Sequence, residues 1–503
     1  MIGAGFSGIG AAIGLRQAGI DDFQVLDERN EVGGTWHANT YPGIAVDIPG
    51  FSYSYSFEPF SAMTRIFPAG AELKAYASAC VDKHRIGEHL RLGVKVTRAR
   101  YDERRHLWRL SLSDGTHTTS RFVICATGWL NKPKWPDIPG LDRFGGDVVH
   151  TSTWDPALAL DGRRVGVIGT GASSVQVVPE IAPSVASLTV FQRTPIWLFP
   201  KPDYALPRLV RALFQRAPWT FRAARLLTDL LTELAFGVGF VHHRQFPFFV
   251  RLGEAFSRLY LRRQVRGDPE LVRKLTPSYG LGCKRPSFSK DYWRTFTRDN
   301  VELVTDEVVE ITETGVRTAD ARERALDVIV LATGFHVLDD FPPLKIYGVG
   351  GVEMGQFWRS QRFQAYEGSS VKGFPNLWFI VGPYAFTGGS WFAAIDYQVV
   401  HAVRVIEEAR RRRVTEVAIR PEKHDAWFEQ TLRRAQSSVF FNNNCGGSNS
   451  YYFDAHGDAP AIRPSTKFQA ARRARTFDLD DYLYERAENE TASDVAPVDG
   501  VGG

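Results

Sequence analysis

In the first third of the chain, short apolar runs of strand length alternate with stretches in which apolar residues recur every three or four positions. The three-to-four spacing of apolar side chains over residues 9–18 predicts a helix, and the apolar run at residues 23–26 predicts a buried strand. Residues 92–123 alternate between polar and apolar positions and carry turn residues, which predicts a β-meander. The apolar run at residues 122–126 then predicts a further buried strand. Helices and strands that alternate in this way are typical of an α/β domain.

The same series occurs a second time. Apolar runs at residues 164–168, 188–191 and 328–332 predict strands, and the first of them is followed by a helical stretch that ends near residue 181. Each series also closes on the same three residues, Ala126-Thr127-Gly128 and Ala332-Thr333-Gly334. Two copies of one closing motif indicate two related domains.

Two further helical stretches complete the pattern. Residues 204–266 have apolar side chains at helical spacing, and residues 392–409 predict another helix. We therefore expect an α/β fold with two Rossmann-like dinucleotide-binding domains and a helical insert in the second. The predicted boundaries are residues 1–145 for the first part of the first domain, 146–334 for the second domain with its insert at 204–266, 335–486 for the returning part of the first domain, and 487–503 for a polar, disordered tail.

Each domain begins with a glycine-rich turn. Gly3, Gly5 and Gly8 match the spacing GxGxxG, in which glycines let the backbone approach a pyrophosphate and the following helix N-terminus supplies free N–H groups. Asp27 ends the next predicted strand, close to the offset of about 20 residues at which an acid meets the ribose hydroxyls. Only Met1 and Ile2 precede Gly3, where this fold needs a buried strand. We expect a start that lies upstream, or else a first unit that lacks half of its βαβ motif and binds its cofactor poorly.

The second turn predicts a preference for one nicotinamide cofactor. Gly169, Thr170, Gly171, Ser173 and Ser174 form the loop, and the strand at residues 188–191 leads to Arg193 and Thr194. An NAD-binding domain places an acid after this strand, whereas a guanidinium pairs with a 2′-phosphate. Arg193 therefore predicts NADPH, although a solvated charge at the strand end is the alternative.

Composition limits the class of protein. The chain has 503 residues, which suits two to three domains, and its hydrophobic content of 44% and charge of 23% are ordinary for a soluble globular protein. A net charge of +5 does not indicate nucleic-acid binding. No apolar run approaches the roughly 18 residues of a membrane span. We expect a cytoplasmic protein of unknown oligomeric state.

The cysteines lie far apart in the sequence. Cys80, Cys125, Cys283 and Cys445 include no CxxC pair and no metal-ligand spacing. We expect reduced thiols, no metal site, and none of the chemistry of the disulfide reductases, which also have two dinucleotide domains.

The excess of positive over negative charge is concentrated in the insert at residues 204–266. Its arginines stand against Asp229, Glu233 and Glu254 alone. We expect an amphipathic cap packed over the second domain. Weak peripheral contact with anionic lipid is the alternative.

Four other stretches carry candidate chemistry. Lys284-Arg285 lies between a glycine turn and a proline, which suits the binding of an anion, and Asp47 follows a Pro-Gly turn in an apolar stretch. For Asp47 the local sequence leaves open whether it caps a turn or acts in a site. Aromatic residues at 383–391 and 440–447 suit an apolar carbonyl substrate.

Several motifs, in order, resemble those of the type I Baeyer–Villiger monooxygenases. Residues Phe144-x-Gly146-xxx-His150-xxx-Trp154-Asp155 match the family fingerprint, and Ala126-Thr127-Gly128-Trp129 matches a second family segment. The chain is most similar to the branch that includes hydroxyacetophenone monooxygenase. The resemblance implies an FAD- and NADPH-dependent enzyme that inserts one atom of O2 beside a ketone carbonyl, through a C4a-peroxyflavin, to give an ester or lactone.

The resemblance also implies individual roles. Arg285 corresponds to the catalytic arginine and Asp47 to the aspartate that orients it. Arg193, Thr194 and Lys284 correspond to contacts with the 2′-phosphate, and Asp27, Thr35, Trp36, Tyr53 and Val96 to FAD contacts. His150 and Trp154 correspond to packing residues of the linker between the domains. A flavin enzyme that oxygenates nitrogen or sulfur, and an uncoupled NADPH oxidase, are the alternatives.

Overall fold

The computed structural model describes residues 1–339 and 341–487, and the predicted tail lies outside them apart from its first residue. The first domain contains a parallel arrangement of short strands. β1 (Val25–Leu26) pairs with β2 (Leu90–Arg91), and β6 (Val123–Cys125) pairs with β20 (Leu377–Phe379). Ile2 bridges both β1 and β6, because its N–H donates to Ile124 O at 2.9 Å and the Gly3 N–H donates to Leu26 O at 2.7 Å. Met1–Gly3 thus occupy the central strand position that the sequence seemed to lack.

The second domain is built on a five-stranded parallel sheet with the order β13-β10-β9-β17-β8. The strands are β8 (Asp147–His150), β9 (Arg164–Ile168), β10 (Ser187–Phe191), β13 (Val301–Val304) and β17 (Val328–Leu331). The predicted strands at 164–168, 188–191 and 328–332 are all present in it. The fingerprint segment predicted as a linker contributes β8, which forms one edge of this sheet. Two dinucleotide-type sheets in one chain confirm the predicted fold class.

Each domain carries an antiparallel meander. The first, predicted over residues 92–123, consists of β3 (Val96–Asp102), β4 (Leu107–Leu112) and β5 (His117–Ser120), to which β19 (Lys345–Tyr347) adds in parallel. The second consists of β14 (Val308–Ile311), β15 (Gly315–Thr318) and β16 (Glu323–Ala325). Two-stranded pairs complete the strands: β7 (Lys132–Pro133) with β18 (Phe335–His336), β11 (Leu198–Phe199) with β12 (Ser287–Phe288), and β21 (Glu416–Ile419) with β22 (Tyr482–Glu485).

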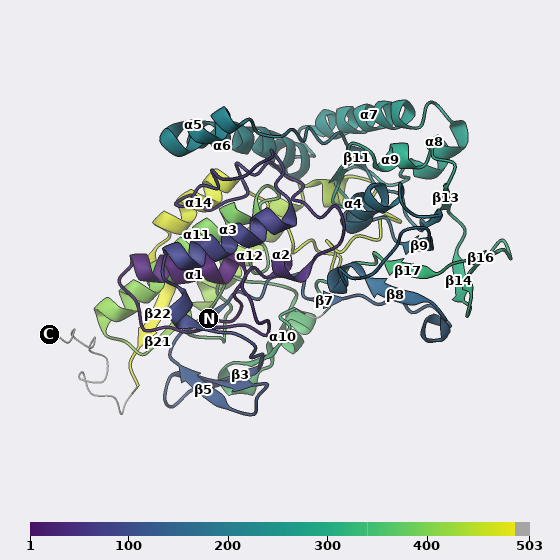
Figure 1. Cartoon of the computed structure of the whole chain (residues 1–503). Helices are drawn as coiled ribbons and strands as arrows, with labels where there is room; N and C mark the ends of the chain where they lie inside the picture. The colour runs from purple at the N-terminus through teal and green to yellow at the C-terminus, as the bar shows by residue number, and fades with distance from the viewer. Residues whose placement is uncertain (340, 488–503) are drawn as a thin grey trace.

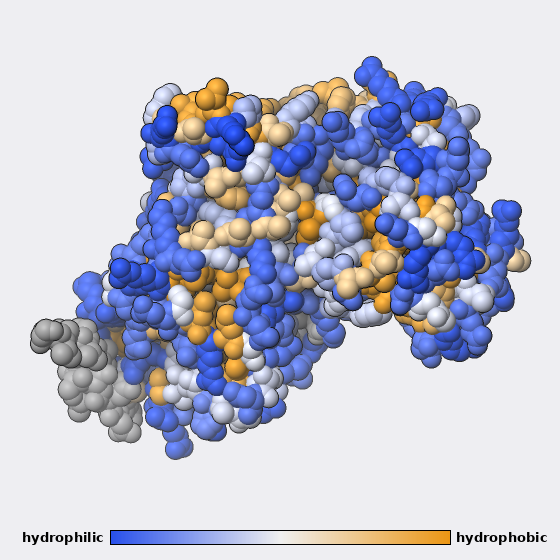
Figure 2. Space-filling model, in the orientation of Figure 1, coloured by the Kyte–Doolittle hydropathy of each residue, from blue (hydrophilic) through white to orange (hydrophobic). Residues whose placement is uncertain are grey.

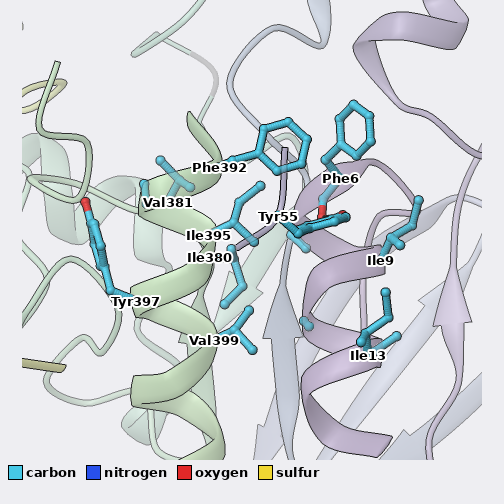
Figure 3. Packing of buried hydrophobic residues seen from close by; sticks show 14 of the residues in the cluster. Phe6, Ile9, Ile13, Tyr55, Ile380, Val381, Phe392, Ile395, Tyr397 and Val399 are labelled. Carbon is cyan, nitrogen blue, oxygen red and sulfur yellow. The ribbon is translucent and has the colours of Figure 1, made fainter. Parts of the chain in front are cut away.

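The core of the first domain lies between the helix after the first glycine loop and the predicted helix at 392–409. These are α1 (Phe6–Gln17) and α11 (Trp391–Arg412). Figure 3 shows Ile395 and Val399 of α11 pointing toward α1, whereas Ile9 and Ile13 lie on the side of α1 that faces away from α11. A Cβ at Gly10 would lie 2.8 Å from Ile395 Cγ2 and one at Gly14 would lie 2.3 Å from Val399 Cγ1, so these glycines let the two helices approach closely. Burial of such side chains stabilises the fold by about 1.5–3 kcal/mol each. The returning chain segment therefore completes the domain that the N-terminal segment begins.

The remaining helices cover the sheets or connect their strands. They are α2 (Thr35–Ala38), α3 (Gly70–Lys83), α4 (Ala172–Ile181), α8 (Pro269–Leu275), α9 (Tyr292–Thr295), α10 (Met354–Gln361), α12 (Pro421–Ala435), α13 (Val439–Asn442) and α14 (Lys467–Thr476), with short 3-10 turns η1 (Gly87–His89), η2 (Leu141–Arg143), η3 (Thr151–Thr153), η5 (Val349–Gly351) and η6 (Leu479–Asp481).

The basic insert is helical, as expected. α5 (Arg208–Arg216), α6 (Pro218–Glu233) and α7 (Pro247–Gln264) lie in a row along one edge of the molecule, with the π-helical segment η4 (Leu234–Val241) between α6 and α7 (Figure 1). No helix in residues 1–339 and 341–487 has the length and apolar character needed to cross a bilayer.

Candidate active site

The first glycine loop packs against Ala126, the residue that follows β6. Gly3 has φ +108°, and a Cβ at this residue would lie 2.5 Å from the carbonyl oxygen of Ala126. A side chain is therefore excluded for both conformational and steric reasons. The Ala4 N–H donates to Asp27 Oδ2 at 2.6 Å. Asp27 thus fixes the shape of the loop from the end of β1.

The second glycine loop repeats this arrangement. Gly169 has φ +113°, and a Cβ there would lie 2.4 Å from the carbonyl oxygen of Ala332. Ala126 and Ala332 both begin the repeated Ala-Thr-Gly motif. In each copy the alanine carbonyl packs closely against the first glycine of a glycine loop. Thr170 Oγ1 donates to the Thr194 carbonyl at 2.5 Å, which ties the loop to the segment after β10.

Aromatic residues line the first domain's side of the site. The Trp36 Nε1–H donates to the Tyr53 hydroxyl oxygen at 3.1 Å, and the rings meet edge to face. Burial raises the pKa of Tyr53 well above its usual range, so this hydroxyl is neutral at physiological pH. A neutral aromatic pair of this kind suits one side of a flat cofactor.

Asp47 and Arg285 come together from positions 238 residues apart. Arg285 Nη2 donates to both carboxylate oxygens of Asp47 at 2.7 Å, and its Nε donates to Oδ2 at 3.1 Å. The charge of Asp47 is the main reason that the pKa of Arg285 is raised, so the guanidinium is a permanent cation. The choice that the sequence left open for Asp47 is therefore decided by geometry: it holds Arg285.

Two cations lie close together beside the second loop. The pKa of Lys284 is lowered to about 8, chiefly by burial and then by the charge of Arg193. Among residues 1–339 and 341–487, neither Lys284 nor Arg193 has an acidic partner within ion-pair distance. Two neighbouring cations without a carboxylate form a binding site for a doubly charged anion such as a phosphate monoester.

A cavity of about 700 Å³ connects most of these groups. The predicted site residues that line it are Gly3, Gly5, Asp27, Thr35, Trp36, Asp47, Tyr53, Val96, Ser173 and Arg285. The predicted residues outside its described lining are Gly8, Gly169, Thr170, Gly171, Ser174, Arg193, Thr194 and Lys284. Apart from Gly8, which lies on α1, this second set lies around the loop of the second domain, where Arg193 is exposed. The cavity therefore suits the flavin and the nicotinamide end, and the open loop suits the rest of the second nucleotide.

Sequence reasoning missed residues that join the two domains. The Tyr41 hydroxyl donates to Gln176 Oε1 at 2.9 Å, and Gln176 Nε2 donates to the Ala45 carbonyl at 2.8 Å. Gln176 lies on α4, directly after the second loop. In the sequence, only its position in the first turns of the helix after the second glycine loop indicated that Gln176 lies near the site.

The fingerprint residues lie at the same junction. Thr40 Oγ1 donates to the Trp154 carbonyl at 3.0 Å. His150 is buried at the end of β8, where its Nδ1 accepts from the Ser152 N–H at 3.1 Å, and burial lowers its pKa. This neutral histidine caps η3 and packs near Trp135 and Phe335. Its position supports the packing role implied by the resemblance.

The expectation that all four cysteines are reduced is wrong for Cys283 and Cys445. They form a disulfide with Cα atoms 5.1 Å apart, although 162 residues separate them in sequence. Cys80 and Cys125 are free and buried. Sequence spacing could not reveal the pairing, because the fold brings the 439–452 segment against the turn at residues 280–283 that precedes Arg285. That segment also contributes Tyr451 and Tyr452 to the cavity lining.

Comparisons with known proteins agree with this geometry. The chain is 36% identical to a Baeyer–Villiger monooxygenase of Pseudomonas aeruginosa, over 96% of this chain and 90% of that protein. It is also 36% identical to a Baeyer–Villiger monooxygenase of Streptomyces coelicolor, over 96% of this chain and 91% of that protein. The chain belongs to the Baeyer–Villiger monooxygenase family.

As a member of this family, the protein is an enzyme, a flavoprotein monooxygenase. A family profile described as "Pyridine nucleotide-disulphide oxidoreductase" matches residues 1–217. Cyclohexanone monooxygenase from Rhodococcus sp. Phi1, solved with NADP+, superposes with a TM-score of 0.85 at 27% identity, covering 97% of this chain and 98% of that one. Steroid monooxygenase bound to NADP superposes with a TM-score of 0.84 at 27% identity, covering 96% and 98%. The predicted type I Baeyer–Villiger resemblance is confirmed.

Proposed function

We propose that the enzyme uses FAD and NADPH to insert one oxygen atom of O2 beside the carbonyl of an apolar ketone, giving an ester or lactone. The single observation that carries the assignment of roles is the three-bond pairing of Arg285 with Asp47 in the cavity between the two glycine loops. When bound, the flavin supplies the redox chemistry and activates O2. The protein supplies position and charge.

The proposed FAD site follows the first loop. The backbone at Gly3, Gly5 and Gly8 lies against the pyrophosphate, where the N-terminus of α1 presents free N–H groups. Asp27 bonds the loop through Ala4, and its carboxylate lies at the ribose end. Thr35, Trp36, Tyr53 and Val96 line the cavity and would hold the flavin there.

The proposed NADPH site follows the second loop. The N-terminus of α4 and the loop of Gly169, Thr170, Gly171, Ser173 and Ser174 receive the pyrophosphate. Arg193, Thr194 and Lys284 receive the 2′-phosphate. Asn449 Nδ2 donates to Thr194 Oγ1 at 2.9 Å and so keeps this hydroxyl oriented.

Arg285 is the proposed catalytic residue, and Asp47 positions it. A permanent cation at the meeting point of the two nucleotides stabilises negative charge that develops on oxygen during attack on a carbonyl. Because Asp47 accepts three hydrogen bonds from Arg285, the guanidinium plane is fixed before substrate arrives. Pre-organisation of this kind avoids a reorganisation cost during the reaction.

The substrate class is proposed from the cavity lining. Phe386, Trp391, Tyr451 and Tyr452 contribute to it, and the two tyrosines lie close enough to Arg285 to interact with its charge. These aromatic groups favour an apolar carbonyl compound over a charged one. We also propose a cytoplasmic enzyme, with weak peripheral membrane contact through residues 204–266.

One experiment separates this function from its alternatives. Ketones, amines and sulfides are incubated with enzyme, NADPH and O2, and products are identified by mass while NADPH use and hydrogen peroxide release are measured. Esters formed in proportion to NADPH support the proposal. N-oxides or sulfoxides without esters, or peroxide release that accounts for all the NADPH, would contradict it.

Arg193→Ala is expected to raise the KM for NADPH about 10- to 100-fold, because a hydrogen bond to a charged group contributes about 1.5–3 kcal/mol. The KM for NADH is expected to change little, since NADH lacks the 2′-phosphate. Steady-state kinetics with both cofactors measure the difference. Equal effects on the two KM values would remove Arg193 from the phosphate site.

Lys284 predicts a pH dependence of NADPH use. Below pH 8 the lysine is protonated and attracts the phosphate, and as the pH rises through about 8 it loses its charge. The value of kcat/KM for NADPH reports ionisations of the free enzyme, so it is expected to fall above pH 8. Lys284→Gln should lower kcat/KM below pH 8 and abolish this fall, whereas Lys290→Gln, an exposed lysine nearby in sequence, should leave the profile unchanged. An unchanged profile in Lys284→Gln would refute the assignment.

A further inference from the structure

The three insert helices present an apolar face to solvent. More than half of the exposed large apolar side chains in residues 1–339 and 341–487 belong to this insert, and Figure 2 shows hydrophobic surface over α5 and α6 along the upper edge of the molecule. The most exposed are Leu209 at 85%, Trp219 at 69% and Leu252 at 65%. From the start of α5 to the end of α7 the set is Leu209, Leu213, Trp219, Leu226, Leu227, Leu230, Leu231, Leu234, Phe246, Phe248, Leu252, Phe256 and Leu259. We call this set the outer apolar face.

The outer apolar face follows the helical repeat. From Leu226 on α6 to Leu234 at the start of η4 its members recur at spacings of three and four, and Trp219 lies seven residues, about two turns, before Leu226. On α7 they recur at three and four from Phe248 to Leu259. Residues at these spacings share one side of a helix. Each helix therefore presents a continuous apolar stripe outward, whereas isolated exposed leucines would need no explanation.

These helices are also firmly attached by their opposite sides. Phe214 and Phe221 are buried and pack against Phe51, with ring centroids 5.7 and 5.6 Å away. Asp229 accepts from Ser52 Oγ at 2.8 Å and pairs with Lys467 Nζ at 2.5 Å. The inner sides thus already supply the packing that holds the insert. The outer apolar face is additional surface that the fold leaves uncovered.

The exposed charged residues of the insert, residues 204–266, are all arginines. Asp229, Glu233 and Glu254 are buried or half-buried, and Glu254 Oε1 accepts from the Leu281 N–H at 3.0 Å. The exposed charged residues of the insert are Arg208, Arg216, Arg222, Arg244, Arg251, Arg258, Arg262, Arg263 and Arg266. Arg222 lies three residues after Trp219, and Arg262 lies three after Leu259, so these arginines border the apolar stripes.

We infer that the outer apolar face docks on the surface of an anionic phospholipid bilayer. Apolar side chains would enter the headgroup boundary while the bordering arginines contact lipid phosphates, each worth about a factor of five in binding. A second copy of the chain fits less well, because a two-fold dimer brings the same patch together and would oppose the arginines with arginines. The proposed oxygenation reaction is not required for this inference.

Vesicle sedimentation tests the inference with the FAD-loaded enzyme. The enzyme is expected to sediment with phosphatidylcholine vesicles that contain about one third phosphatidylglycerol, and binding should weaken at high salt or with phosphatidylcholine alone. Leu227→Ser/Leu231→Ser/Leu252→Ser, at side chains that are 61%, 60% and 65% exposed, should reduce bound enzyme about tenfold or more. Arg251→Glu/Arg262→Glu/Arg263→Glu should reduce it specifically on anionic vesicles.

A control triple variant changes exposed apolar residues outside the insert. Val309→Ser/Val349→Ser/Val352→Ser alters side chains that are 49%, 40% and 46% exposed and should bind as the parent does. Retained flavin and circular dichroism show that each variant is folded. Failure of the parent enzyme to bind anionic vesicles would overturn the inference. So would binding that survives both triple changes, or a concentration-dependent dimer that the serine changes dissociate.

Discussion

Arg285→Ala is expected to lower ester formation by about 10²- to 10³-fold while NADPH still reduces the flavin. Loss of a single pre-organised group that stabilises negative charge on oxygen has an effect of this size in other enzymes. In the cavity Arg285 donates three hydrogen bonds to the carboxylate of Asp47, so its cation has a fixed position. Product analysis measures the ester, and anaerobic stopped-flow spectroscopy measures flavin reduction.

Two companion variants separate charge from geometry. Arg285→Lys keeps a positive charge but cannot make the paired contacts with Asp47, and it should recover only a small part of the activity. Asp47→Asn keeps the shape of the side chain and removes the charge that holds the guanidinium, so an intermediate loss is expected. Full ester formation by Arg285→Ala would show that the cation has no part in the reaction.

Gly169→Ala is expected to abolish productive NADPH binding and to destabilise the second domain. The new Cβ would lie 2.4 Å from the Ala332 carbonyl oxygen, and φ +113° is unfavourable for alanine. Strain of this kind costs about 1–3 kcal/mol. The melting temperature and the NADPH dissociation constant should both change, whereas bound FAD should remain.

Gly171→Ala is the matched control, because a Cβ at Gly171 meets nothing within 4 Å in the protein and φ is not positive. This variant should keep the melting temperature of the parent. Any loss of NADPH affinity in Gly171→Ala then measures contact with the nucleotide itself. If Gly169→Ala bound NADPH normally and kept its stability, the close approach of Ala332 to the loop would have no energetic consequence.

The fold was largely predictable because its strands are short, buried and apolar, and its glycine loops have fixed spacing. The strand at 164–168 was predicted at its observed bounds. The predicted strand at 23–26 is shorter, and only Val25 and Leu26 form β1, since the preceding residues are partly exposed and have no strand partner of their own. Local pattern could not show that Met1–Gly3 complete the central strand position, because that depends on β1 and β6 from either side.

The site was less predictable from local sequence. The local sequence around Asp47 and Arg285 does not indicate that the two residues pair. The family resemblance implied that Asp47 orients Arg285, and in the structure the two side chains are hydrogen-bonded. The contact between Tyr41 and Gln176 and the disulfide between Cys283 and Cys445 were missed for the same physical reason. Each depends on how two distant chain segments pack, and no periodicity within one segment reports on that.

The disulfide has a consequence for altering substrate range. Cys283 stands two residues before Arg285, and Cys445 stands six before Tyr451, so the covalent tie anchors one end of the loop that carries Tyr451 and Tyr452. The Gly280 N–H also donates to the Asn444 carbonyl at 2.7 Å at that end. Cys445 is therefore held in place, and any movement of the loop is confined to the residues that follow it. Residues 446–453 are accordingly the segment to diversify in a directed-evolution library, since the pocket wall can be reshaped there while the catalytic cation stays in place.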